Sequence, residues 1–461
     1  MNLRRLPACL LASTVLCLAR FAFAEEPTLP GIGAAMQEVV AKKGALSSSQ
    51  RNGMEAAASA VLGEWMRNQL RALYESEGYR VESMNTDGER AQVTLLWDER
   101  HRPRCGACTQ PMRINRKTRQ GAMDLPLGPA SFVLVVYEAV QGYCRPCGHY
   151  ETVRPLQIVE QHTATLRLMR QISLLCRWLP VQSVCELVPV PPMTAYRYDR
   201  YILQTELPAP RLDGLEALLI DEKHLGRAGF VTLVLNARTG ELLWLAEGRG
   251  KAALDGFFAK LSTAQKASIA AVGIDRSGAY RAAVEAHLPQ ADIVFDKFHL
   301  ISNLGEVIDR VRRRTQAQAD AEGRTFLKGQ RYNLLRNPEN LSTDGRRQLD
   351  ILLAANRDLS IVYLLKDAFK AIWTYTYRKC ADNCLSNWVG MARESGVAEL
   401  ARFANGLNEA REQILNFCEH RITSARIEAF NTIVSRVIHK ACGVANLDFL
   451  FLKLRQESLQ R

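Results

Sequence analysis

Short apolar runs alternate with amphipathic stretches between residues 215 and 314, and this alternation limits the fold more than any other feature of the chain. The first three runs are separated only by turn residues, which predicts two successive antiparallel hairpins. A stretch with helical periodicity lies between the last two runs, and another follows the final run. The predicted order β-β-β-α-β-α-β-α favours an α/β fold whose mixed sheet passes from antiparallel strands into parallel units. The predicted strands are 215–220, 230–235, 241–245, 269–274 and 293–295. The last helix of this order is predicted at 304–314, with Asn303 as its cap. A further strand is predicted at 91–97, before the first cysteine pair.

Three acidic residues stand where this fold would bring them together. Asp221 and Asp275 directly follow the first and fourth strands, and functional groups in α/β sheets usually lie at the carboxyl ends of strands. Glu428 lies on a predicted amphipathic helix, Arg421 to Ala441, whose apolar stripe would pack on the sheet. That stripe is Ile427, Phe430, Val434, Val437 and Ala441, beside a polar stripe of Ser424, Glu428, Asn431 and Ser435.

Three carboxylates without a His or Cys ligand suit a hard cation, Mg²⁺ or Mn²⁺. Two such ions would support phosphoryl transfer on a polyanion. We therefore predict Asp221, Asp275 and Glu428 as catalytic and metal-binding residues. The alternative is that each acid is an ordinary surface carboxylate or a helix cap, with no catalytic role.

Two neighbouring acids compete with this set. Glu222 follows Asp221 directly, but successive residues of a strand face opposite sides. Asp296 also ends a strand, and it either binds metal or orients Lys297 and His299 toward DNA. We favour the second role and predict Lys297 and His299 as DNA contacts, although a lone histidine is more often structural.

Four of the twelve cysteines form two CxxC pairs, which supply the thiolates of a tetrahedral structural Zn²⁺ site. The predicted ligands are Cys105, Cys108, Cys144 and Cys147. The long gap between the pairs requires a hairpin, and residues 131–140 are apolar enough to form it. The alternative is reduced, unliganded cysteines; His101 and His149 are poor alternative ligands. The scattered remaining cysteines fit a reducing compartment better than a disulfide framework.

The chain is basic, with a formal net charge of +12, which favours an anionic partner. Residues 100–123 hold seven Arg or Lys and no acid, and a second basic cluster spans 310–314. Either cluster alone could be a solvated face; beside the acidic and cysteine motifs they favour double-stranded DNA. Predicted helices at 166–178, 181–187 and 193–203 resemble a helix-turn-helix. The predicted contacts are Arg113, Arg116, Lys117 and Arg119 in the basic segment, and Thr194, Tyr196, Arg197 and Arg200, with Tyr198, in the third helix.

The first 24 residues conflict with this interpretation because they have the pattern of a secretory signal. We prefer a start codon placed too far upstream, with Met54, Met66 or Met84 nearer the true start. The expected location is cytoplasmic, without a membrane span.

Taken together, the motifs resemble those of the ISL-three family of insertion-sequence transposases, within the DDE transposases. The resemblance covers about residues 78 to 455. The chain departs from the family's pattern at two positions. It has Thr423-Ser424 where the family commonly has a Thr-Asn pair, and Arg276 where a Met is common. The matching stretches are the module from Cys105 to Cys147, Ile220-Asp-Glu-Lys, Ala246-Glu-Gly-Arg, Gly273-Ile-Asp-Arg-Ser-Gly-Ala-Tyr, Val294-Phe-Asp-Lys-Phe-His, and Ser424-Ala-Arg-Ile-Glu-Ala-Phe-Asn with Gly443.

The resemblance implies a ribonuclease-H-like mixed sheet with a helical insertion, preceded by a zinc-ribbon-like module and a helix-turn-helix. It implies Asp221, Asp275 and Glu428 as the catalytic triad of an enzyme that binds terminal inverted repeats, hydrolyses the phosphodiester at each element end and transfers the strand to target DNA. Such an enzyme would act as a homo-oligomer. The expected domains are an unassigned extension (1–65), a zinc module (78–155), a helix-turn-helix (156–208), the catalytic domain (212–315 and 421–461) and its insertion (316–420).

Three alternatives remain open at this point. One is a catalytically inactive, transposase-derived DNA-binding protein. Another is a different nuclease on the same fold, such as a junction resolvase, which would yield no strand-transfer product. The third is a secreted protein, as residues 1–24 suggest.

Overall fold

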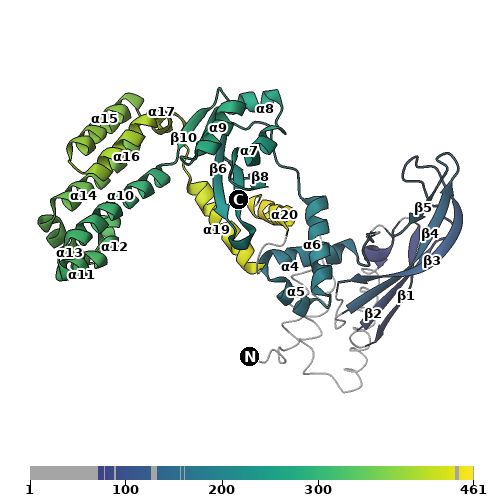
Figure 1. Cartoon of the computed structure of the whole chain (residues 1–461). Helices are drawn as coiled ribbons and strands as arrows, with labels where there is room; N and C mark the ends of the chain where they lie inside the picture. Colours follow the sequence, from purple (N-terminus) through teal and green to yellow (C-terminus); the bar gives the residue numbers. More distant parts are fainter. Residues whose placement is uncertain are drawn as a thin grey trace, which may run out of the picture. The chain divides into compact units, whose positions relative to one another are not determined.

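The computed structural model describes residues 71–459 except 77, 88–89, 126–131, 156, 160 and 442–445. The expectations for residues 1–65 and for Gly443 therefore lie outside the described residues. The chain divides into two compact units, the second of which begins at Leu203 (Figure 1). In the part of the chain that is described, no helix is both long and apolar enough to cross a bilayer.

The first unit contains a five-stranded sheet in the order β1-β2-β4-β3, with β5 paired to β4. Its β2–β4 pair is parallel, and the β1–β2, β3–β4 and β4–β5 pairs are antiparallel. β2 is the strand expected at residues 91–97, and β3–β4 is the hairpin expected between the two cysteine pairs. The strands are β1 (Tyr79–Asp87), β2 (Arg90–Trp97), β3 (Arg113–Asp124), β4 (Phe132–Cys144) and β5 (His149–Val153).

Three helices follow this sheet: α4 (Leu166–Trp178), α5 (Val181–Leu187) and α6 (Pro192–Glu206). The bounds of α4 and α5 are those expected from the sequence, and α6 is longer than expected. Thr165 caps α4 by accepting a hydrogen bond from the Leu168 amide. The helices share an apolar core, so the expected three-helix bundle is present.

A buried carboxylate joins the sheet to the bundle. Asp124, at the end of β3, accepts hydrogen bonds at 2.5 Å from both the Tyr74 and the Thr165 hydroxyls. It also forms an ion pair with Arg167 of α4. The Asp124 side chain is fully buried, so a segment before β1, the end of β3 and the start of α4 meet at one charged centre.

The second unit is built on a sheet in the order β10-β9-β6-β7-β8. The β6–β7 and β7–β8 pairs are antiparallel, whereas β9 is parallel to both β6 and β10. This is the element order expected from the sequence, with the first and fourth strands adjacent. The elements are β6 (Ala217–His224), β7 (Phe230–Asn236), β8 (Leu242–Glu247), α7 (Lys251–Phe258), α8 (Thr263–Ser268), β9 (Ala271–Ile274), α9 (Gly278–His287), β10 (Asp292–Phe295) and α10 (Lys297–Gln318).

Several local expectations for this unit were wrong. Asp221 was expected directly after the first strand, but β6 continues through it to His224. The short helix α8 was not expected, and β9 is correspondingly shorter at its start. Helix α10 begins at Lys297 rather than near residue 304, because Asp296 caps it by accepting hydrogen bonds from the amides of Phe298 and His299. The capping pattern expected at Asn303 lies inside the helix.

The sheet carries helices on both faces. One face packs into the core that includes α7, α9 and α10. The other is covered by α19 (Ala425–Lys440) and α20 (Leu447–Ser458) (Figure 1). Leu219 and Leu233 share an apolar cluster with Ile427 and Phe430 on this face. The expected apolar stripe of α19 is thus confirmed, apart from Ala441, which follows the helix and is exposed.

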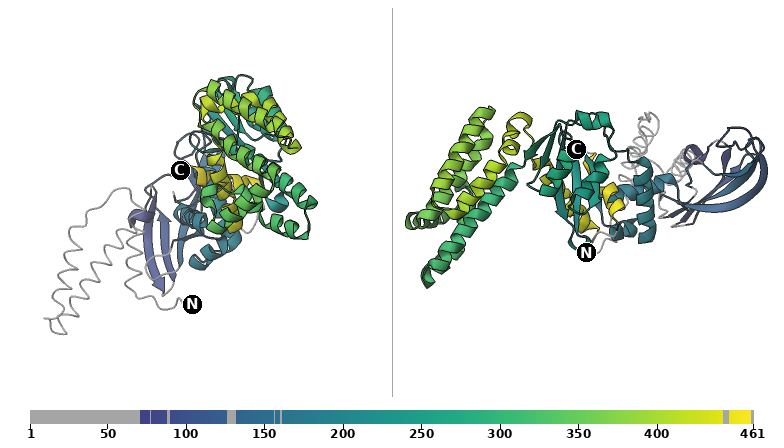
Figure 2. Two further views of the ribbon diagram at one scale, coloured as in Figure 1. Left: turned by 90° about the vertical axis from the view of Figure 1, so that its left-hand side faces the viewer. Right: turned by 45° about the horizontal axis from the view of Figure 1, so that its top comes forward.

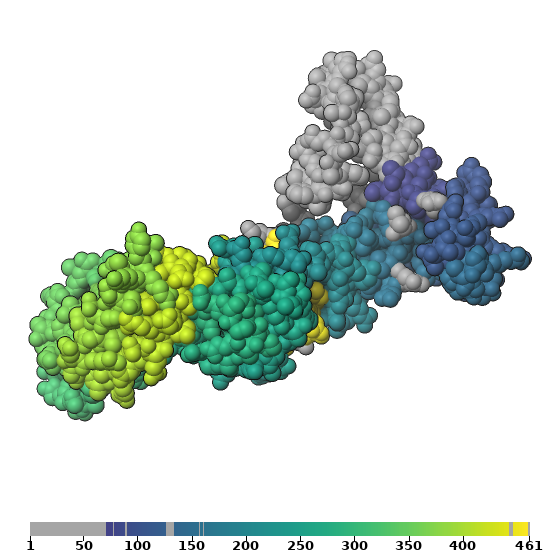
Figure 3. Space-filling view, turned by 90° about the horizontal axis from the view of Figure 1, so that it is seen from above, coloured from purple at the N-terminus to yellow at the C-terminus, as the bar shows by residue number. Residues whose placement is uncertain are grey.

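Between α10 and α19 the chain is helical, as expected for residues 316–420. Figure 2 shows α10 extending away from the sheet, and it packs against α14 and α16. In the space-filling view the insertion forms a lobe beside the α/β part of the same unit (Figure 3). Its helices are α11 (Ala321–Gly329), α12 (Arg331–Leu335), α13 (Thr343–Ala355), α14 (Arg357–Lys370), α15 (Arg378–Glu394), α16 (Ala398–Glu409), α17 (Arg411–Leu415) and α18 (Phe417–His420).

The second basic cluster is largely used inside this lobe. Arg312 and Arg313 both form ion pairs with the buried Asp309, at 2.8 and 2.5 Å. Arg314 forms ion pairs with Asp358 and Glu399 at 2.6 and 2.9 Å. The pairs of Arg314 link α10 to α14 and α16, whereas those of Arg312 and Arg313 with Asp309 lie within α10 itself. These three arginines therefore already have carboxylate partners, and a DNA role for the cluster stays a prediction.

Candidate active site and cysteine cluster

The strand register places three aspartates in one row. Leu219 of β6 pairs with Gly273 of β9, and Ile274 of β9 pairs with Phe295 of β10. Continuing both registers aligns Asp221 with Asp275 and Asp275 with Asp296. Residues in one row of a sheet face the same side, and adjacent strands lie about 4.8 Å apart. Asp275 is therefore the central member of the row.

Glycine in β9 allows another segment to pass over this row. A Cβ atom at Gly273 would lie 2.8 Å from Leu219 Cδ2 and 2.9 Å from Ile422 Cγ2. Those separations are too short for carbon atoms, so a larger residue would push the segment before α19 off the sheet. That segment leads directly to Ser424 and Glu428, and its height over β9 sets how closely Glu428 approaches the aspartates.

Asp221 is mostly buried and firmly held. Its Oδ2 accepts a hydrogen bond from the Asn431 side chain at 2.7 Å, and its Oδ1 accepts one from the Glu222 amide at 2.8 Å. Burial raises the pKa of the Asp221 carboxyl, and the negative charge of Asp275 acts in the same direction. The two hydrogen bonds and the nearby His299 oppose the increase without cancelling it.

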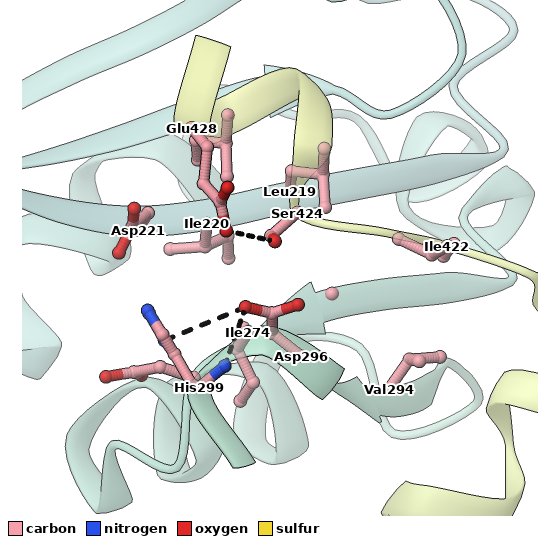
Figure 4. A pocket seen from close by; sticks show the side chains of 13 residues that line it. Leu219, Ile220, Asp221, Ile274, Val294, Asp296, His299, Ile422, Ser424 and Glu428 are labelled. Carbon is pink, nitrogen blue, oxygen red and sulfur yellow. Dashed lines mark hydrogen bonds and ion pairs between the residues drawn. The ribbon is translucent and has the colours of Figure 1, made fainter. Parts of the chain in front are cut away.

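Asp275, Glu428 and Ser424 line the same pocket as Asp221 (Figure 4). Asp275 Oδ1 accepts a hydrogen bond from the Ser277 amide at 2.9 Å. Glu428 enters the pocket from α19, where the Ser424 hydroxyl donates to Glu428 Oε1 at 2.8 Å. The predicted polar stripe is present, since Ser424 binds Glu428 and Asn431 binds Asp221.

The three acids share a pocket but not a ready-made coordination shell. Among the described residues, the clusters whose ligand atoms all lie within 4.8 Å of one another include the four cysteines but not Asp221, Asp275 and Glu428. The hydrogen bonds from Asn431 and Ser424 account for the directions in which Asp221 and Glu428 point. Mutual repulsion between ionised carboxylates favours the same separation.

Asp296 and His299 enter the pocket from the side of α10 (Figure 4). Asp296 Oδ2 lies 3.8 Å from His299 Nδ1. The two side chains are adjacent but beyond hydrogen-bond distance, so the orienting role of Asp296 stays a prediction. Lys297 is not among the lining residues of the pocket; its ammonium lies 5.2 Å from the Phe298 ring centre.

Glu222 faces away from the pocket, as expected. Thr232, its partner in the β6–β7 register, lies 2.9 Å from the Tyr280 hydroxyl of α9. Glu222 is therefore on the α9 face of the sheet, where Arg249 lies 3.8 Å from it.

The four predicted zinc ligands converge in the first unit. Their sulfur atoms all lie within 4.8 Å of one another, with 3.5 Å between Cys108 and Cys144 and 4.0 Å between Cys105 and Cys147. A tetrahedral site with Zn–S bonds of about 2.3 Å has sulfur–sulfur edges of about 3.8 Å. The geometry is therefore compatible with a bound zinc ion.

His149 lies closer to this cluster than the sequence suggested, with Nε2 3.9 Å from Cys105 Sγ. Glu151 is 3.8 Å from the same histidine and accepts a hydrogen bond from the Gly106 amide at 2.8 Å. These contacts brace the first cysteine pair from the neighbouring strand β5. His101 instead lies 3.7 Å from Asp98.

The predicted DNA contacts of the first unit differ in exposure. Arg113, Arg116 and Arg119 on β3 are exposed, whereas Lys117 is three-quarters buried and forms ion pairs with Glu99 and Glu138. On α6, Arg197 is exposed and Thr194, Tyr196 and Arg200 are half-buried. Tyr198 is buried in the bundle core against His162, so its expected availability to DNA was wrong.

Comparison with known proteins gives one consistent picture. A sequence profile described as a transposase matches residues 218–454. The transposase of insertion sequence element IS1001 from Bordetella parapertussis is 32% identical over 356 residues, which covers 76% of this chain and 87% of that protein. The transposase of insertion sequence element IS1557 from Mycobacterium tuberculosis (strain CDC 1551 / Oshkosh) is 26% identical over 295 residues, covering 58% and 66%.

Proposed function

The chain belongs to the ISL-three family of transposases, as its motifs predicted, and from this premise we propose that it is a DDE enzyme. It would bind the terminal inverted repeats of an insertion sequence, cut the phosphodiester at each end and direct the freed 3′-hydroxyl at target DNA. The observation that carries this proposal is that Asp221, Asp275 and Glu428 line one pocket although they come from β6, β9 and α19. The order β10-β9-β6-β7-β8, with a helical insertion before α19, supports a ribonuclease-H-like assignment.

The residues of the pocket fit a hard divalent cation. Asp221, Asp275 and Glu428 offer carboxylate oxygens, and the raised pKa of Asp221 marks a site where negative charge lacks compensation. Bound Mg²⁺ or Mn²⁺ would supply Lewis-acid polarisation of the phosphate and a more acidic water or hydroxyl. Glu428 would turn from Ser424 toward the aspartates when it serves as a ligand.

Other residues of the pocket would position the DNA strand. Asp296 fixes the backbone at the start of α10 and lies beside the His299 ring. His299 would then direct its other ring nitrogen, Nε2, toward a phosphate oxygen. Lys297, on the same turn of α10, would contact the sugar-phosphate backbone of the DNA outside the pocket.

The first unit would recognise the element ends. We assign residues 78–155 to a zinc module held by Cys105, Cys108, Cys144 and Cys147, and residues 156–208 to a helix-turn-helix whose reading helix is α6. Arg113, Arg116 and Arg119, with Arg197 on α6, are exposed and suited to phosphate contacts. In the second unit, 212–315 and 421–461 would form the catalytic domain around the insertion 316–420. Pairing two element ends requires at least a dimer.

Cleavage of a labelled terminal repeat in the presence of Mg²⁺ tests the proposal. Asp275→Ala is expected to lower cutting at least about 10³-fold, because it removes the central carboxylate of the row, while repeat binding is retained. Asp344→Ala, which removes an exposed acid of the insertion, is the matched control. Unchanged cutting by Asp275→Ala would reject the assignment. An inactive DNA-binding derivative predicts binding but no cut product from the wild-type chain.

A further inference from the structure

A second cavity lies at the opposite edge of the catalytic sheet, and we propose that it binds phosphates of the DNA backbone; this inference rests on the proposed function. The cavity, here called the amino-edge cleft, has a volume of about 380 Å³. It is bounded by the start of β6, the residue before β9, the turn after β7 and the segment 419–423 with Arg426. Three arginines line it: Arg238, Arg421 and Arg426.

The cleft and the catalytic pocket are connected by one short segment, Arg421 to Ser424. Ile422 lines both cavities, with Arg421 on the cleft side and Ser424 on the pocket side. Because Ile422 rests on Gly273, this segment runs over β9. The three residue steps from Arg421 to Ser424 can span at most about 10 Å, and successive phosphates of one strand advance about 3.4 Å along a duplex axis. A strand whose phosphate sits in the pocket therefore reaches the cleft within about three nucleotides.

The arginines of the cleft are available to an anion. Arg421 and Arg426 are exposed, and neither has a carboxylate within the 4.0 Å ion-pair distance in the described parts of the chain. Arg238 pairs with Glu216 at 3.2 Å, but both side chains are mostly exposed, so solvent already screens this pair and a phosphate can replace it. Guanidinium groups bind phosphate oxygens in pairs, with two donors on one plane.

The acids around the cleft are already paired. Glu419 lies 3.3 Å from Arg378, and Asp292 lies 2.8 Å from His420. Three arginines line the cleft against two acids, Glu216 and Glu419, so the net charge of its lining is positive. This charge balance favours a polyanion over an acidic or neutral protein surface.

The backbone at Arg421, the C-cap of α18, sets the direction in which the chain leaves that helix. Its φ of 50° is left-handed, and among non-glycine residues in the described ranges only Thr109 shares this feature. L-residues seldom adopt this conformation, and it recurs at functional sites. Here it turns the chain from α18 into the segment over β9, while the Arg421 guanidinium donates to the Tyr375 carbonyl at 3.0 Å. In this position Arg421 lines the cleft.

Binding of the full-length chain to non-specific duplex DNA, measured between 50 and 200 mM salt, tests the charge contribution. The double variant Arg238→Ala/Arg426→Ala should lower the slope of log affinity against log salt by about 1.8, or about 0.9 for each lost phosphate. The ratio of wild-type affinity to variant affinity should then fall about tenfold between 50 and 200 mM salt. The control Arg324→Ala/Arg347→Ala removes two exposed arginines from the insertion, and Arg426→Lys keeps the charge. Thermal melting verifies that each variant is folded.

Two reaction assays distinguish the sources of the phosphate. If the cleft holds target DNA, the double variant cuts an element end normally but joins a pre-cut end to a target plasmid at least about tenfold less well. If it holds the element end, cutting and joining fall together. A double variant that matches its control in salt slope, cutting and joining overturns the inference. Failure of the wild-type chain to cut or join would instead reject the proposed function, and the salt slope would still report on the cleft.

Discussion

Asp221 is the residue at which charge and burial conflict most directly. It must be ionised to bind a cation, yet burial and the charge of Asp275 raise its pKa. Burial is the main cause of this shift, and a bound divalent cation would stabilise the ionised form that burial disfavours. Asn431 and the Glu222 amide stabilise the ionised form through hydrogen bonds, and they hold the side chain in place without neutralising it.

Asp221→Asn should raise the free energy of unfolding at pH 7 in the absence of divalent cations. A folded-state pKa above the unfolded value means that the folded protein binds more protons, so wild-type stability falls as pH rises between the two pKa values. Above the folded-state pKa the wild type has lost all of this stability, because the buried Asp221 is then ionised. The neutral Asn of the variant does not cause this loss. Urea unfolding from pH 4 to pH 8 measures the difference.

The same variant separates stability from function. Mg²⁺ should stabilise the wild type more than Asp221→Asn, because the variant lacks one of the three carboxylates that would bind the ion. A variant less stable than the wild type at pH 7, or equally stabilised by Mg²⁺, would contradict this account.

At the scale of elements, the Asp124 centre fixes the sheet of the first unit to its three-helix bundle. The carboxylate belongs to β3, its ion-pair partner Arg167 belongs to α4, and Tyr74 precedes β1. Arg167 also lies over the Tyr74 ring, with the guanidinium carbon 4.6 Å from the ring centre. The expected zinc module and helix-turn-helix are thus coupled through one buried network.

Asp124→Ala is expected to destabilise the first unit by about 3–5 kcal/mol, because removing one partner leaves Arg167 buried without its counter-charge. Repeat binding should weaken as the bundle loses its fixed position on the sheet. Differential scanning calorimetry and a binding assay measure the two effects, with Asp98→Ala as a control for an acid whose partner Arg100 is exposed. A loss of less than about 1 kcal/mol in the free energy of unfolding would show that this network does not hold the sheet and the three-helix bundle together.

At the scale of the whole molecule, the two compact units divide the expected tasks. The cysteine cluster and the three helices lie in the first unit, and the carboxylate pocket and the amino-edge cleft lie in the second. The units have separate hydrophobic cores. Perturbing the cysteine cluster should therefore affect recognition before it affects the catalytic fold.

The purified chain should contain about one zinc ion, and chelation should lower the melting transition of the first unit while that of the second remains. A structural zinc site contributes folding free energy directly, because thiolate ligands are assembled only in the folded state. Cys108→Ser should reproduce the effect, and Cys380→Ser, which changes an exposed cysteine outside the cluster, should not. Metal analysis and calorimetry measure both; a metal-free chain with an unchanged melt would contradict the zinc assignment.

Local patterns were sufficient for several elements. The bounds of α4 and α5 follow from apolar periodicity and flanking prolines, and the strand order follows from turn spacing and connection rules. The start of α10 was missed because two capping signals lie close together, and only the end of β10 at Phe295 decides in favour of Asp296. The role of the second basic cluster was missed because Asp358 and Glu399, the partners of Arg314, are distant in the chain.

The amino-acid order alone was enough to identify Asp221, Asp275 and Glu428 as candidates and the two CxxC pairs as one cluster, because their chemistry and spacing are local properties. Only the folded chain aligned Asp296 with Asp275, placed Ile422 on Gly273 and collected Arg238, Arg421 and Arg426 around one cleft. Register and close approach depend on which distant segments pack together. That outcome is decided by the sum of many weak contacts, and no single stretch of sequence contains it.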